Sequence, residues 1–152
     1  MAAALAILVL LGVGAAVALP RLVPTNSPMH IHPWLTITIE GQGAATVPTN
    51  IGIDPSLWND HSLDGYNMDG MSPLHTHKAT GEIHVESTVT RDYTLGEFFR
   101  VWGESFDAQQ VLGHPAGAGH RVWMVVDGTE MAPTYSLVFR DGMRIQIICG
   151  LA

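Results

Sequence analysis

An uncharged apolar run at the N-terminus is the feature that most constrains what this chain can form. Residues 2–19 carry no charged side chain, and Arg21 follows directly after Pro20. About 18 apolar residues come close to the roughly 20 that a helix needs to cross about 30 Å of hydrocarbon. The run therefore predicts a transmembrane helix at residues 1–23.

A cleaved secretory signal is the alternative interpretation of the same run. The small residues "AVA" at 16–18 resemble a cleavage site, but the run has no preceding Lys or Arg, so an uncleaved anchor is favoured. Arg21 alone favours a cytoplasmic domain. The signal-like form of the run and the histidine-rich sequence after it favour the other side. We therefore expect a single-pass membrane protein whose domain lies on the extracytoplasmic (periplasmic) side.

Charge and cysteine content exclude several classes of function. The chain of 152 residues has a net charge of −7 and only seven Lys and Arg, which are scattered rather than clustered. Such a chain lacks the basic surface that nucleic-acid binding requires. Its one cysteine, Cys149, excludes an intrachain disulfide framework and every multi-cysteine zinc pattern.

Proline content and alternation predict a linker followed by strands. Residues 24–33 are rich in proline and are typical of an extended linker. The stretch "WLTITIE" at 34–40 alternates apolar and polar side chains, which predicts a half-buried strand. A second short strand is expected at 44–48, after a Gly-rich turn. Residues 50–72 show no clear period.

A short amphipathic helix is predicted after the middle of the chain. Thr94 and Glu97 have the spacing of a capping box, in which each side chain accepts a hydrogen bond from the other residue's backbone N–H. Gly103 is expected to end the helix. The apolar residues at helical spacing are Leu95, Phe98, Phe99 and Trp102.

The C-terminal part of the chain predicts further strands. "HRVWMVVDG" at 120–128 is typical of a strand that ends in a turn. "YSLVFRDGMRIQIICG" at 135–150 predicts a hairpin with its turn at the Asp-Gly pair. Alternation in the last strand places Cys149 on an apolar face, so it is expected to be a core residue.

These C-terminal stretches resemble a known family. Residues 120–149, with "VWMVVDG" and "LVFRDGMRIQIICG", are similar to the ending of the β-grasp sulfur carriers of thiamine and molybdopterin biosynthesis. The resemblance implies an α+β class with a β-grasp-like domain at 34–152, interrupted by an insertion at 50–92. Those carriers end in an activated Gly-Gly, whereas this chain ends "CGLA", so their activity is not implied. Residues 30–105 also resemble small His-containing extracytoplasmic domains of bacteria and archaea.

The insertion contains a hairpin-like stretch, "PLHTHKATGEIHVES", with three histidines and two glutamates. If its turn is "KATG", His75 opposes His84 and His77 opposes Glu82. If the turn is only "TG", His77 opposes His84 and His75 opposes Glu86. Either even-length loop leaves these side chains on one face, because opposite residues in a hairpin point to the same side. The other, buried face is expected to carry Leu74, Thr76, Ile83 and Val85.

A shared face of imidazoles and carboxylates on the open side of the hairpin is a candidate metal site. Imidazole with carboxylate suits zinc or Cu(II) best, while the thioethers of Met29, Met68 and Met71 favour Cu(I). A copper or zinc ion is thus the expected cofactor. The alternative is that these histidines are structural groups hydrogen-bonded to glutamate or backbone, because no specific metal motif is matched. The candidate ligands are His30, His32, His75, His77, Glu82, His84 and Glu86.

Two functions from different classes follow. The first is a non-catalytic accessory subunit of a larger membrane complex, respiratory or photosynthetic for example, whose partners are other membrane subunits and the lipid bilayer. Small residues in "LLGVGAA" favour such close helix packing. The second is an extracytoplasmic copper- or zinc-binding protein. No nucleophile elbow or phosphate loop occurs, so no enzymatic reaction is indicated.

Overall fold

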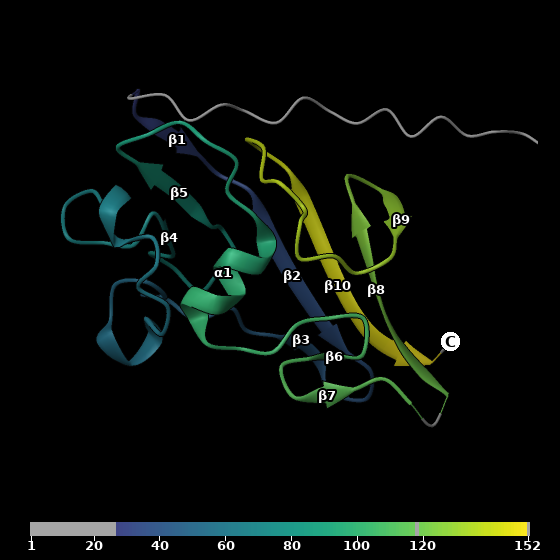
Figure 1. Cartoon of the computed structure of the whole chain (residues 1–152). Helices are drawn as coiled ribbons and strands as arrows, with labels where there is room; N and C mark the ends of the chain where they lie inside the picture. Colours follow the sequence, from purple (N-terminus) through teal and green to yellow (C-terminus); the bar gives the residue numbers. More distant parts are fainter. Residues whose placement is uncertain (1–26, 118, 152) are drawn as a thin grey trace, which may run out of the picture.

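The computed structural model describes residues 27–117 and 119–151 (Figure 1). The elements in chain order are β1 (Met29–Ile31), β2 (Trp34–Ile39), β3 (Gly43–Ala45), the 3-10 helices η1 (Pro55–Leu57) and η2 (Asp64–Tyr66), β4 (Leu74–His75), β5 (His84–Ser87), α1 (Leu95–Trp102), β6 (Gln110–Val111), β7 (His114–Pro115), β8 (His120–Val126), β9 (Thr129–Met131) and β10 (Arg144–Leu151).

A five-stranded sheet with the order β3-β2-β10-β8-β9 forms the larger part of the fold. Strands β2 and β10 run side by side in parallel, and β10 pairs with β8 in antiparallel fashion (Figure 1). The alternation in β2 is confirmed, since Leu35, Ile37 and Ile39 are buried while Thr36 and Thr38 are exposed. The apolar face of this sheet contributes one side of the hydrophobic core.

A second sheet has the order β1-β5-β4 and carries most of the histidines of interest. Strand β1 lies within the range that the sequence predicts as a linker. Its pairing with β5 continues past Pro33, because Trp34 bridges Glu82 and the Leu35 amide donates to the Gly81 carbonyl at 2.7 Å. The same stretch of chain, residues 29–39, thus belongs first to the small sheet and then to the large one.

Helix α1 confirms the prediction made from its capping residues. The Thr94 side chain accepts from the Glu97 amide, and the Glu97 carboxylate accepts from the Thr94 amide at 2.8 Å. Gly103 ends the helix with φ +85°, in the left-handed region that glycine tolerates best. The predicted apolar residues Leu95, Phe98, Phe99 and Trp102 are all buried in the core.

The predicted C-terminal hairpin is wrong in its first strand. Residues 135–140 do not pair with β10. Instead, the Leu95 amide donates to the Leu137 carbonyl at 2.9 Å, and the Phe139 amide to the Tyr93 carbonyl at 2.8 Å. The reason is that β2 and β8 already occupy both edges of β10. Cys149 lies in β10 and is buried, as expected, and burial raises the pKa of its thiol.

The expected α+β class and membrane topology also need correction. The described chain is mostly β, with the eight-residue α1 as the α-helix of this part of the chain. Among residues 27–117 and 119–151, no helix has the length and apolar character needed to cross a membrane. The predicted span at residues 1–23 lies outside the described residues. The described part of the chain gives no support to the expected single-pass membrane protein with an extracytoplasmic domain.

Candidate metal centre

Three strands bring histidines to one face of the small sheet. Strand β5 pairs with β1 so that His30 is opposite Glu86, and this register extends to place His32 opposite His84. On its other side β5 pairs with β4, with His75 opposite His84. Since opposite residues of antiparallel strands point to the same face, these side chains meet. The centre of the sheet thus carries a row of imidazoles from β5, from β4 and from the residue after β1.

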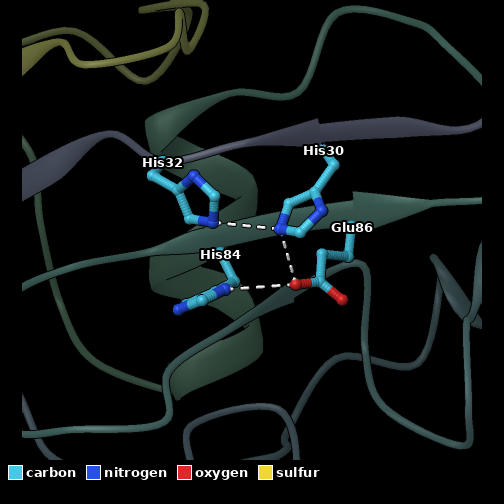
Figure 2. A group of neighbouring side chains, drawn as sticks. All are labelled: His30, His32, His84 and Glu86. Atoms are coloured by element: carbon cyan, nitrogen blue, oxygen red, sulfur yellow. Dashed lines mark hydrogen bonds and ion pairs between the residues drawn. The ribbon is translucent and has the colours of Figure 1, made fainter.

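The first group of possible ligands lies between β1 and β5 (Figure 2). His30 Nε2 is 3.0 Å from His32 Nε2 and 2.9 Å from Glu86 Oε1, and the same oxygen is 3.1 Å from His84 Nδ1. One donor atom from each of the four residues lies within 4.8 Å of the others. Tetrahedral zinc with bonds of about 2.0–2.1 Å separates its ligands by about 3.3 Å. The shortest separations here are close to that value.

The second group lies between β4 and β5. It consists of His75, His77, His84 and Glu86, and one donor atom from each lies within 4.8 Å of the others. The Nε2 atoms of His75 and His77 are 3.2 Å apart. The His77 and His84 rings meet edge to face, with centroids 4.6 Å apart. The His75 and His84 rings stack at 5.4 Å. These His and Glu side chains lie close enough together to hold a metal ion.

The predicted division of the hairpin into two faces is correct, but the histidine face is less exposed than predicted. Leu74, Thr76, Ile83 and Val85 are buried as expected, and the register matches the "KATG" turn. His75, however, is fully buried rather than on an open side. The outer edge of β4 is covered, because the Asn50 amide donates to the Thr76 carbonyl and the Thr76 amide to the Ile51 carbonyl.

Hydrogen bonds settle which nitrogen of two histidines carries the proton. His75 Nδ1 is 2.8 Å from the Ser72 carbonyl oxygen, which can only accept, so Nδ1 is the donor. The lone pair of neutral His75 is then on Nε2, which points to His77. His84 Nδ1 donates to Glu86 Oε1 and so leaves Nε2 as its lone pair. Second partners of this kind orient imidazoles for metal binding.

Burial and neighbouring charges keep these groups in the state that metal binding requires. Desolvation lowers the pKa of His75 to about 4, and the adjacent His77 and His84 act in the same direction. Desolvation also lowers the pKa of His84, although its bond to Glu86 opposes the shift. Desolvation alone would raise the pKa of Glu86, but the His84 hydrogen bond and the nearby imidazoles outweigh it and lower that pKa. At neutral pH, His75 and His84 are uncharged and Glu86 is ionised.

Several predicted or possible ligands lie outside both groups. Glu82 Oε2 is 3.9 Å from His84 Nε2 and belongs to neither group. Met29 packs against the core on the face of β1 opposite His30, so its thioether does not join the imidazoles. His114 in β7 and His120 in β8 are half-buried and also lie outside both groups.

Sequence reasoning missed two residues that support the centre. The Ser72 carbonyl orients His75, and the Asp141 carboxylate accepts from the His32 amide at 2.9 Å. A hydrogen bond to a backbone carbonyl leaves no signal in the sequence, because every residue has such a carbonyl. Asp141 is separated from His32 by more than a hundred residues, and its Asp-Gly pair indicated only a turn.

The chain was compared with known proteins, and no family model, curated protein or solved structure matches it. The resemblances to β-grasp sulfur carriers and to small His-containing domains therefore stay predictions.

Proposed function

We propose that this chain is a metal-binding protein that holds zinc or Cu(II) in the His/Glu centre of its small sheet. The observation that carries the proposal is the convergence of five imidazoles and one carboxylate from three segments of the chain. In both His-x-His pairs, the Nε2 atoms of the two imidazoles lie close to each other. A structural histidine needs one or two hydrogen-bond partners, which backbone carbonyls supply more readily than other imidazoles.

The donor atoms favour zinc or Cu(II) over other ions. Both groups offer imidazole nitrogens with one carboxylate oxygen, a set that suits borderline divalent metals. Mg²⁺ and Ca²⁺ prefer all-oxygen sites. Cu(I) favours thioether and thiolate sulfur, and Met29 faces the core while Cys149 lies in the other sheet.

The protein's own groups make the centre ready for an ion. His75 and His84 are neutral at pH 7, so no proton has to leave a charged ring before binding. Ser72 and Glu86 hold these two rings in place. The accessory-subunit function remains a prediction that rested on residues 2–19, which lie outside the described residues.

The test is isothermal titration calorimetry on the full chain, purified without a polyhistidine tag and stripped with chelator. Zn²⁺ and glycine-buffered Cu²⁺ are titrated into wild type, His84→Ala and His61→Ala. His84 belongs to both groups, so its removal should weaken binding on the order of 100-fold. His61 is exposed, bonds Asp64 at 3.0 Å and lies outside both groups, so its variant should bind like wild type.

Two outcomes of the calorimetry would contradict the proposal. If wild type binds neither ion more tightly than His84→Ala does, the histidines are structural and the proposal fails. Tight binding of Mg²⁺ or Ca²⁺ in place of zinc would also contradict it.

A further inference from the structure

We infer that the centre holds two metal ions at once, one on each side of β5. The inference rests on the proposed function and adds to it the number of ions and the role of each strand. Two groups of ligands exist, and they share only His84 and Glu86. The other members are separate, because His30 and His32 come from the β1 side whereas His75 and His77 come from the β4 side.

The two sides of β5 repeat one arrangement. Each outer segment supplies a His-x-His pair, and alternation along an extended strand places both rings of a pair on the same face. The Nε2 atoms are 3.0 Å apart in the pair at His30 and 3.2 Å apart in the pair at His75. A single ion in either group would leave the close pair of Nε2 atoms in the other group without an ion.

The shared residues have donor atoms for both sides. Glu86 Oε1 lies 2.9 Å from His30 Nε2, on the β1 side, and its carboxylate has a second oxygen. The lone pair of His84 is on Nε2, since Nδ1 donates to Glu86, and its ring contacts those of both His75 and His77. We assign His30, His32 and Glu86 to the first ion, and His75, His77 and His84 to the second. Glu86 lies between the two ions as a bridging carboxylate.

The carboxylates at the centre reduce the electrostatic cost of holding two ions. Two divalent ions placed close together repel strongly, and an ionised carboxylate between them offsets part of that repulsion. Glu86 is half-buried, and its Oε1 atom lies 3.1 Å from His84 Nδ1 and 2.9 Å from His30 Nε2. Glu82 lies at the rim, 3.9 Å from His84 Nε2, and adds a second negative charge there.

Native mass spectrometry of the full chain, loaded with excess Zn²⁺ and freed of unbound metal, counts the ions. Wild type should carry two. His30→Ala/His32→Ala should carry one, and so should His77→Ala, which removes an exposed ligand and spares the buried His75. The control, His61→Ala/His120→Ala, removes two histidines elsewhere and should keep two ions. Circular dichroism checks that each metal-free variant remains folded.

Other numbers of bound ions would overturn the inference. One ion on wild type overturns the inference while the proposed function stands, and none overturns both. Loss of all metal from His30→Ala/His32→Ala would mean that the two pairs serve a single ion. Loss of one ion from the control would place the second ion outside the centre. Either result overturns the inference.

Electron paramagnetic resonance with Cu²⁺ adds a measure of proximity. The first equivalent should give an ordinary Cu(II) signal, and the second should broaden it or diminish it through coupling between neighbouring ions. A signal that simply doubles would place the ions far apart and contradict the shared centre.

Discussion

At the scale of single residues, His75 shows how far the fold departs from a solvated hairpin. Its ring is fully buried, donates to the Ser72 carbonyl and faces His77 and His84. A buried imidazole with such neighbours stays neutral, because charging it would place a cation among other imidazoles in a poorly solvated site. The same neutrality makes its Nε2 atom available to a metal ion.

The burial of His75 predicts a pH dependence of the stability of the metal-free chain. The unfolded chain binds a proton at His75 below about pH 6.5, whereas the folded chain does so only near pH 4. Stability therefore falls as the pH drops through this window, by up to about 1.4 kcal/mol per pH unit for one group. Urea unfolding in chelator at pH 6 and pH 5 should show a smaller loss for His75→Asn than for wild type.

His61→Asn is the matched control, because it removes an exposed histidine that lies outside both groups. Equal losses of stability for wild type and His75→Asn would contradict the burial of a neutral ring at this position.

At the scale of elements, patterns within a few residues correctly predicted strands and a helix. The pairing between strands distant in sequence was not predicted. The alternation in β2 and the capping box of α1 are encoded within a few residues, and both predictions are confirmed. The division of the hairpin into an apolar face and a His/Glu face was also predicted correctly, because any turn of even length gives the same two faces. The pairing of β1 with β5 joins residues more than fifty apart, and no local signal in a proline-rich stretch indicates it. The sequence could therefore name His30 and His32 as candidates without placing them opposite β5.

The junction between the two sheets depends on a glycine. Gly81 has φ +82°, and its carbonyl accepts from the Leu35 amide. A Cβ at this position would overlap the backbone oxygen of Leu35, whereas Gly41, with φ +78°, has nothing nearby. Gly41→Ala should thus cost about 1–2 kcal/mol for the left-handed backbone alone. Gly81→Ala should cost on the order of 3 kcal/mol or more, because strain and overlap add.

Chemical denaturation of the two metal-free variants compares these costs directly. Equal losses of unfolding free energy would mean that the close approach between Gly81 and β2 does not exist in solution.

At the scale of the whole molecule, the proposed centre ties the small sheet together. Its ligands extend from His30 to Glu86, and β1 itself has only three residues. An ion that binds the folded chain but not the unfolded one adds its binding free energy to the stability of the fold. The centre therefore has a structural consequence whatever further role the metal has.

Zinc should accordingly raise the melting temperature of the chain. At a free concentration 100 times the dissociation constant, one bound ion adds about 2.7 kcal/mol. For a domain of this size that corresponds to roughly 10 °C. Differential scanning calorimetry with increasing Zn²⁺ should show a rise for wild type and for His61→Ala, and a much smaller one for His84→Ala. A rise of the same size with Mg²⁺ would point to a nonspecific ionic effect instead.

A crystal structure of the zinc-loaded full chain, with anomalous diffraction measured on both sides of the zinc absorption edge, would locate the proposed ions directly. Anomalous peaks are expected on the face of β5 that carries His84 and Glu86, one beside His30 and His32 and one beside His75 and His77. A zinc-saturated crystal with no anomalous peak at these histidines would contradict the proposed function.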